Sequence, residues 1–399
     1  MDAKIIAVVV ALVICGSAAA YFGEIDHGDR DGAIQIVDGS GAKIALSEPL
    51  TGVVTVNTNV PKAMKVLGLV DELKGLCFYS SSSALDNENY AQFRVLFPDS
   101  VHMPEARTLT AEAVIERSGC RYVIAPVTSM TLNPTQQTQF EQLGITVIRL
   151  DCFGDTALDD LRKLAILFGG IHGGERGVRN ERATVAYHDY MEMYENVVKT
   201  VKAAVAAQGK ADATFLYFTG TAAGGGTFYN QTAGGSVMIE QIYGRNALRN
   251  VGLSSANLTG PTNPSGADGI KEVVTAEDRN NGIDKIFIRG SSSTSSGDGT
   301  NMARGALGIW NNCNLPGYNL SAVAANEVYV FNTNIMSGML SFAAWVAVAE
   351  MCGVDTGLHI ADLITSYNER YGFSELTYGY VFKMTGGDTG SISFTEMIV

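Results

Sequence analysis

The segment that follows Gly177 and ends at Gln208 contains neither glycine nor proline, and it restricts the possible folds of this chain more than any other feature. Glycine and proline are the residues that interrupt helices, so the segment predicts one continuous helix. At 1.5 Å per residue such a helix is about 45 Å long. Strand-like segments lie on both sides of it but not within it. We therefore expect a rigid spine helix between two α/β halves.

A short sequence occurs once in each half. Thr110-Ala111-Glu112 precedes the apolar run from Arg121 to Ala125, and Thr275-Ala276-Glu277 precedes the run from Lys285 to Arg289. Thr is a good N-cap, and a Glu in the first turn interacts favourably with the helix dipole. The β-branched and aromatic runs suit strands that are buried on both faces. Each copy thus predicts a capped helix followed by a buried strand, and the halves are expected to be similar lobes with a ligand bound between them.

Strand and helix patterns alternate in both halves. A small hairpin is expected from Ala33 to Pro49. The predicted strands are Val53–Val56, Leu73–Tyr79, Tyr122–Pro126, Thr146–Leu150, Thr214–Phe218, Lys285–Arg289 and Glu327–Phe331. The predicted helices are Pro61–Leu67, Thr110–Arg117, Pro134–Leu143, Ser236–Tyr243 and Ser341–Met351, the last a core helix because charged residues curtail it. The predicted fold class is α/β, with central and mostly parallel sheets in both lobes.

The first residues indicate the compartment. Ile5 to Gly23 is a run of 19 residues without a charge, preceded by Lys4. About 20 apolar residues cross a bilayer, and a lone Lys on the short side places that end in the cytoplasm. Ala18-Ala19-Ala20 also fits a signal-peptide cleavage site, so the segment is either a retained anchor, which we favour, or a cleaved signal. The body is predicted to be extracytoplasmic, at the cell surface.

These patterns define the expected domains. They are a membrane anchor or signal segment (1–23), a tether (24–32), an N-terminal lobe (33–165), a spine-helix region (166–208) and a C-terminal lobe (209–399).

Composition excludes several function classes. With 46% hydrophobic and 17% charged residues the chain is globular, and a net charge of −13 argues against nucleic-acid binding. The five histidines are scattered, without the spacing of a metal site. The glycine-rich loop from Thr219 to Thr227 has neither a Walker lysine nor the Rossmann glycine spacing. No catalytic residue, metal site or cofactor is predicted, and the protein is not expected to be an enzyme.

Polar and aromatic residues follow the predicted strands, at the position where open α/β sheets bind ligands. Two further candidates lie near loops, Arg107 ahead of the first Thr-Ala-Glu copy and Trp310 after a Ser/Gly-rich loop. Together they predict an aromatic cleft with guanidinium groups, suited to a bulky anionic or metal-chelate ligand. The candidate ligand-binding residues are Asn57, Tyr79, Arg107, Thr128, Tyr217, Tyr229, Arg289 and Trp310.

Several longer segments, taken in order, resemble a known family. They are VVTVNTNVPKAMKVLGLVDELKG, TAEAVIERSGCRYVIAP, GGSVMIEQIYGRNAL, VTAEDRNNGIDKIFIRG, NEVYVFNTNIMSG and YNERYG. Their order around a long central helix, from Ala33 to Phe382, is similar to that of the ABC-importer substrate-binding proteins for ferric siderophores, haem and cobalamin. The resemblance implies capture of a ferric siderophore or related chelate and its delivery to a permease and its ATPase, with haem or cobalamin as alternative ligands.

The resemblance also implies a role for two acidic residues. In this family an acidic residue on each lobe docks into arginine pockets of the permease, and Glu112 and Glu277 occupy the matching positions. The simpler interpretation is that both only stabilise helix N-termini, by about 0.3–1 kcal/mol each. The chain departs from the family at Lys62, where many members have Glu, and in the polar insertion from Ser254 to Ala267. A cell-surface structural protein that reuses the fold is the alternative function.

Overall fold

A computed structural model describes most of the chain after Ala33, and residues Ile34–Val399 form one compact unit. The described ranges are 34–78, 93–127, 132–170, 181–220, 226–229, 233–249, 258–259, 274–290, 306–311, 319–373, 380–387 and 391–397. The expected membrane segment, the tether, Tyr79 and Thr128 lie outside them. Within these ranges, no helix is both long and apolar enough to span a bilayer.

The predicted hairpin is present and is attached to the first sheet. Strands β1 (Ile34–Val37) and β2 (Lys43–Leu46) pair antiparallel. Their turn is closed by Asp38, whose Oδ1 accepts hydrogen bonds from the amides of Ser40 at 2.9 Å and Ala42 at 3.0 Å. The Gly39 amide donates to the carbonyl of Arg149 at 2.7 Å, and the Arg149 amide donates to Asp38 Oδ2 at 2.9 Å. The hairpin turn thus covers the open edge of the sheet, which would otherwise present unpaired backbone groups.

The N-terminal lobe is built on a five-stranded sheet with the order β5-β4-β3-β6-β7, and all of its pairings are parallel. Its strands are β3 (Val53–Thr55), β4 (Leu73–Leu76), β5 (Val101–His102), β6 (Tyr122–Ala125) and β7 (Thr146–Arg149), and its helices are α2 (Asn59–Val66), α4 (Ala111–Ser118), α5 (Pro134–Gln142) and α6 (Ala157–Leu167). The strand order reverses between β3 and β6. Open sheets of this type bind ligands beyond the carboxyl ends of the strands at such a reversal.

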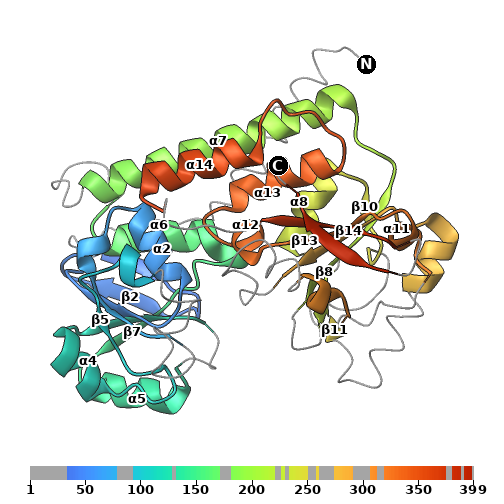
Figure 1. Ribbon diagram of the computed structural model, residues 1–399. Helices are drawn as coiled ribbons and strands as arrows, with labels where there is room; N and C mark the ends of the chain where they lie inside the picture. The colour runs from blue at the N-terminus through green and yellow to red at the C-terminus, as the bar shows by residue number, and fades with distance from the viewer. Residues whose placement is uncertain are drawn as a thin grey trace. The chain divides into compact units, whose positions relative to one another are not determined.

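The predicted spine helix is α7 (Glu181–Gln208), which runs for 28 residues without a break. Its buried residues recur at helical spacing, as expected for a helix with one buried face: Ala183, Tyr187, Tyr190, Val197, Val201 and Val205. It packs against α2 and α6 of the N-terminal lobe and against α8 (Gly234–Ile242) and α13 (Ser341–Met351) of the C-terminal lobe. Helix α14 (Ile360–Tyr371) lies beside it (Figure 1), tied by an ion pair of 2.7 Å between Arg370 and Asp189.

The C-terminal sheet is mixed, which corrects the prediction of a mostly parallel sheet. Strands β8, β12 and β13 are parallel, whereas β9, β11, β14 and β15 join by antiparallel pairings. Its strands are β8 (Thr214–Gly220), β9 (Gly226–Phe228), β10 (Arg245–Asn246), β11 (Leu258–Thr259), β12 (Lys285–Arg289), β13 (Val328–Phe331), β14 (Val381–Thr385) and β15 (Ser393–Glu396). Short helices α11 (Ser321–Ala324) and α12 (Thr333–Ser337) flank β13.

One hydrophobic core contains side chains from both sheets. It includes Ile124 and Ile148 of the N-terminal sheet, Phe215 and Phe287 of the C-terminal sheet, and the buried face of α7. Helix α13 is buried along almost its whole length in this core, as predicted. The two lobes therefore pack as one body rather than as separately folded domains.

The two Thr-Ala-Glu copies differ in structure. Thr110 is the N-cap of α4, and its Oγ1 accepts a hydrogen bond from the Ala113 amide at 3.2 Å. In the second copy the helical residues run from 274 to 281, so Thr275 lies inside the helix. The prediction that Thr275 caps this helix is wrong. Val274, directly before it, is itself helical and is fully buried in the second core.

Candidate functional site

Three of the predicted ligand-binding residues converge at the carboxyl ends of the central strands of the C-terminal sheet. Tyr217 lies on β8, Arg289 ends β12, and Tyr229 follows β9. Strands β8 and β12 are parallel neighbours, with Thr219 paired to Arg289. The Tyr229 amide donates to the Tyr217 carbonyl at 3.0 Å. Residues from three separate strands thus meet at one sheet edge, as expected for an α/β ligand site.

The guanidinium of Arg289 is held in a fixed position. Its Nη1 donates to Ser337 Oγ at 2.7 Å and its Nη2 donates to the hydroxyl of Tyr229 at 2.9 Å. Its central carbon lies 5.5 Å from the centre of the Tyr229 ring. Thr219 also donates to the Tyr229 hydroxyl, at 2.8 Å. A guanidinium anchored in this way presents a preorganised cation with little rotamer freedom left to lose on binding.

Tyr217 forms the buried floor below this cation. Its ring stacks on that of Tyr229 with centroids 5.2 Å apart. Burial raises the pKa of Tyr217 to about 12; Tyr229 and Asp155 act in the same direction and Arg289 opposes them. A Cβ at position 235 would lie 2.5 Å from the Tyr217 hydroxyl, so a glycine there lets α8 lie directly against the ring.

The N-terminal lobe contributes the opposite wall through the loop after β7. The ring of Phe153 lies 5.5 Å from the Arg289 guanidinium carbon, on which the Tyr229 ring also packs. Asp155 Oδ2 accepts a hydrogen bond of 3.1 Å from the amide of Gly234, the first residue of α8. A carboxylate at a helix N-terminus is stabilised by the free amides and the helix dipole. We call Phe153, Asp155, Tyr217, Tyr229 and Arg289 the interlobe cluster.

A small cavity of about 30 Å³ also lies between residues of the two lobes. Among its lining residues are Lys62 of α2, Cys152 of the loop after β7, and Asn334 of α12. Lys62 Nζ donates to Asn334 Oδ1 at 3.3 Å. Although part of its side chain is exposed, burial lowers the pKa of Lys62 to about 8. Lys62 thus forms a direct contact between the lobes.

The other predicted residues have different surroundings. Asn57 follows β3, and its Oδ1 accepts hydrogen bonds from the Asn59 and Val60 amides at 3.1 and 2.8 Å, so it caps α2. Arg107 is exposed, and its carbonyl accepts from the side chain of Gln136 at 3.2 Å. Trp310 is only 1% exposed and packs in the second core, among side chains such as Ile309 and Ile288. The prediction that Trp310 lines the cleft therefore does not agree with its position in the core.

The two acidic residues expected at the permease interface differ from each other in exposure and in bonding. Glu112 is exposed in the first turn of α4. Glu277 is half-buried, accepts a hydrogen bond of 2.8 Å from Asn281, and lies 3.8 Å from the guanidinium of Arg245.

Phe153 and Asp155 were not among the ligand-binding residues predicted from the sequence. Both follow β7, so the rule that selected residues after strand ends could have included them. Ser337 was also missed, because it lies on a short helix five residues after Asn332 rather than directly after a strand.

The interlobe cluster combines the Arg289 cation with hydroxyl groups and aromatic faces, and its one carboxylate, Asp155, is bonded to the amide of Gly234. The cation and the rings suit an anionic ligand with planar groups, through charge-assisted hydrogen bonds and stacking. Within the described ranges, no group of three or more His, Cys, Asp or Glu residues could hold a metal ion.

Solved structures of similar fold have been determined. A TroA-like periplasmic binding protein, FepB, from Veillonella parvula aligns with a TM-score of 0.57 at 15% identity, over 88% of this chain and 99% of that one. A second periplasmic binding protein from Veillonella parvula has a TM-score of 0.54 at 14% identity, over 80% and 97%. An ABC-type Fe³⁺-hydroxamate transport protein from Saccharomonospora viridis has a TM-score of 0.50 at 18% identity, over 80% and 98%.

Neither a scan of protein-family models nor a search of curated proteins finds a match. The structural likeness nevertheless extends over nearly the whole length of the solved proteins. The chain therefore has the fold of the periplasmic substrate-binding proteins, and the resemblance seen in the sequence is confirmed at the level of the fold.

Proposed function

We propose that this protein is an extracytoplasmic substrate-binding protein of an ABC importer, and that it captures a ferric siderophore or a related metal chelate between its lobes. The observation that carries the proposal is the anchored guanidinium of Arg289, set between the rings of Phe153 and Tyr229 at the carboxyl edge of the C-terminal sheet. Haem and cobalamin are the alternative ligands. Binding requires no covalent chemistry.

The cation of the cluster favours one ligand type. Arg289 carries the positive charge, and the half-buried Tyr229 and Phe153 offer ring faces, whereas Tyr217 is buried beneath Tyr229. Ferric catecholates carry negative charge on planar aromatic groups, and haem carries carboxylates on a planar ring. We expect such ligands to bind more tightly than neutral ferric hydroxamates, because a neutral complex offers no negative charge to pair with the guanidinium.

Delivery to a permease requires an outer docking surface on each lobe. We propose Glu112 and Glu277 for this role, with residues 1–23 holding the protein at the membrane. The proposed domains are the N-terminal lobe (33–165), the spine region (166–208) and the C-terminal lobe (209–399). The core shared by both sheets and α7 supports small closures of the cleft rather than wide hinge bending.

Ligand titration of the purified full-length protein tests the proposal. Tryptophan and tyrosine fluorescence and native mass spectrometry would be recorded with the ferric tris-catecholate complex, ferric citrate, a ferric hydroxamate, haemin and cyanocobalamin. We expect saturable one-to-one binding of at least one chelate, with the anionic ones preferred. Binding of none, together with self-association of the protein, would instead support the surface structural function.

A further inference from the structure

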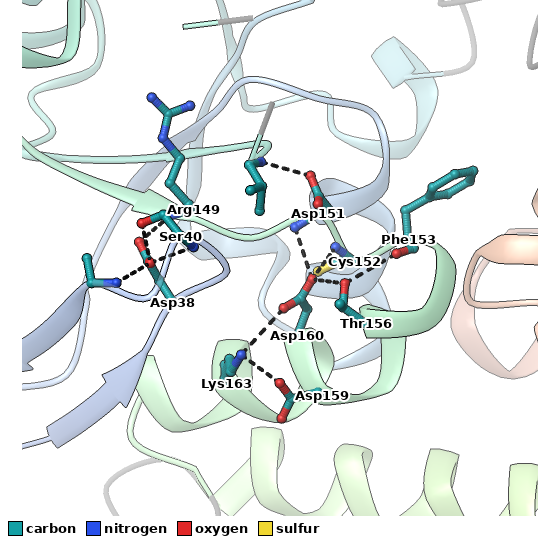
Figure 2. A network of polar contacts seen from close by, with 12 residues as sticks. Asp38, Ser40, Arg149, Asp151, Cys152, Phe153, Thr156, Asp159, Asp160 and Lys163 are labelled. Carbon is teal, nitrogen blue, oxygen red and sulfur yellow. Dashed lines mark hydrogen bonds and ion pairs between the residues drawn. The ribbon is translucent and has the colours of Figure 1, made fainter. Parts of the chain in front are cut away.

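The loop after β7 is held by one buried carboxylate. Asp160 lies in the first turn of α6 and is 1% exposed. Its Oδ2 accepts three hydrogen bonds from this loop: from the amides of Asp151 and Cys152, both at 3.0 Å, and from Thr156 Oγ1 at 2.9 Å. Figure 2 shows these donors meeting at a single oxygen. The Asp160 side chain therefore fixes both ends of the segment between residues 151 and 156.

This fixation enforces an unusual backbone conformation. Cys152 has a φ of 48°, in the left-handed region that L residues rarely adopt. Such a conformation is strained and persists only where the surroundings impose it. The Cys152 amide is one of the groups that Asp160 binds. Strained residues held in this way are concentrated at ligand sites.

The segment carries the N-terminal wall of the interlobe cluster. Phe153 follows Cys152 directly and packs on the Arg289 guanidinium at 5.5 Å. Asp155 reaches the amide of Gly234 at 3.1 Å. The neighbouring loop is tied to the same segment, because Asp151 Oδ1 accepts from the Val127 amide at 3.0 Å, just after β6.

We infer that Asp160 is a positioning residue for the ligand site: through three hydrogen bonds to the 151–156 segment, it fixes Phe153 and Asp155 in place before ligand arrives. The effect of Asp160 on ligand binding rests on the proposed function, whereas its ordering of the 151–156 segment does not. The N-terminal side of the interlobe cluster is then preformed.

The chain offers a matched control on the same helix. Asp159 is next to Asp160 and pairs with the same lysine, Lys163, at 2.6 Å, whereas Asp160 Oδ1 lies 3.9 Å from it. The side chain of Asp159 is 51% exposed. Asp159→Ala therefore removes a carboxylate and a lysine contact without touching the loop. Asp160→Asn keeps one acceptor oxygen and removes the charge.

Hydrogen–deuterium exchange of the full-length, ligand-free protein gives the first measurement. We expect Asp160→Ala to speed exchange at the Asp151 and Cys152 amides at least tenfold, while Asp160→Asn keeps most of the protection and Asp159→Ala leaves it unchanged. Equal exchange in Asp160→Ala and Asp159→Ala would overturn the inference. If Asp160→Ala fails to fold, Thr156→Val replaces it in the comparison with Asp159→Ala. This variant removes one of the three donors to Asp160, so exchange should speed up by a smaller factor.

Titration with the ferric tris-catecholate complex gives the second measurement. We expect about tenfold weaker binding in Asp160→Ala, mainly through faster dissociation, and near-normal binding in Asp160→Asn. Faster exchange with unchanged affinity would limit Asp160 to a structural role and overturn the positioning assignment. If the unaltered protein binds no chelate, the proposed function fails, and the exchange data still decide whether Asp160 orders the loop.

Discussion

The guanidinium of Arg289 and the ring of Phe153 lie 5.5 Å apart, although the two residues belong to different lobes and are far apart in the sequence. The contact joins the last residue of β12 to the loop after β7. It places a cation and an aromatic face side by side at the same site. An anionic aromatic ligand could interact with both without a large rearrangement of either lobe.

Arg289 should dominate the affinity for anionic chelates. Arg289→Gln removes a charge-assisted donor worth about 1.5–3 kcal/mol, so affinity for the ferric tris-catecholate complex should fall about 10- to 100-fold. Arg289→Lys should recover part of the loss, because it keeps the charge but not the planar donor fork. Arg249→Gln is the control, since Arg249 is 55% exposed and pairs only distantly with Glu240, at 4.0 Å. If Arg289→Gln and Arg249→Gln bind the complex with equal affinity, the ligand must bind at another site.

Glu112 and Glu277 should affect transport without affecting ligand capture. The double variant Glu112→Ala/Glu277→Ala is expected to abolish chelate uptake in cells and leave affinity unchanged. Glu116→Ala, also exposed on α4, is the matched control. Normal uptake by the double variant would reduce both residues to contributors to local helix stability.

Lys62 should make stability depend on pH in the alkaline range. Its pKa is lowered from 10.5 to about 8 by burial, so between these pH values the unfolded state binds more protons than the folded state. Stability contributed by this group must then rise with pH across that window, by at most about 3 kcal/mol. Urea unfolding from pH 7.5 to 10.5 should show the rise in the stability difference between the unaltered protein and Lys62→Met, because the buried Cys and Tyr groups that titrate in this range when unfolded are common to both. Lys43→Met, an exposed control on β2, should keep the slope of the unaltered protein. An identical slope in Lys62→Met would refute the assignment.

Glu327 should make stability depend on pH in the acid range, with the same sign as Lys62, because the pKa of its carboxyl is also lowered in the folded protein. Burial acts to raise its pKa, but hydrogen bonds from Lys285, Lys383 and Tyr329 outweigh this effect and hold the pKa below its usual 4.5. Lys383 Nζ donates at 2.9 Å and the Tyr329 hydroxyl at 2.7 Å, with Lys285 in direct contact. Because the folded pKa is depressed, the stabilisation is complete above pH 4.5 and is lost as pH falls through the folded pKa.

Glu327→Gln should therefore destabilise the protein at pH 7 by about 1–2 kcal/mol, a value reduced for the partial exposure of the group. The difference from the unaltered protein should shrink in acid. Thermal unfolding at pH 7 and pH 4 measures it, and a difference that grows on acidification would contradict the sign.

The two threonines of the repeated sequence should respond differently to the same substitution. Thr110→Val removes an N-cap side chain and should cost about 1 kcal/mol. Thr275→Val should cost less, because Thr275 lies inside its helix. Denaturant unfolding of both variants compares them directly, and equal losses would show that Thr275 also acts as a cap.

Elements with strong local patterns were predictable from the sequence. The spine helix, the hairpin turn and the strands β3, β6, β7, β8 and β12 were expected close to their observed bounds. The antiparallel strands of the C-terminal sheet were not, because strand direction depends on distant partners. Val381–Thr385 pairs with β13, some fifty residues earlier in the chain.

The candidate site was predictable only in part. Tyr229 and Arg289 lie at strand ends, as the rule for ligand sites in open sheets expects, and Tyr217 contacts Tyr229 from the middle of β8. Trp310 lies near a loop in the sequence, yet it packs in the core, which a short pattern cannot reveal. Phe153 and Asp160 matter through contacts between lobes and through buried hydrogen bonds, and neither leaves a periodic signal.

Helix α7 also limits how the length of this protein can change during evolution. Near its start Arg182 packs against Gly68, and at its end Gln208 bonds to Asp355, with a side-chain donor at 2.6 Å from the Asp355 carbonyl. Each added residue turns the following part of a helix by about 100°. One insertion at its centre would rotate the surface that meets α13 away from its partner while leaving α2 in register. Changes of seven or eleven residues nearly restore the helical phase but still move that surface by about 10 or 16 Å along the axis, so the length of α7 should be held constant.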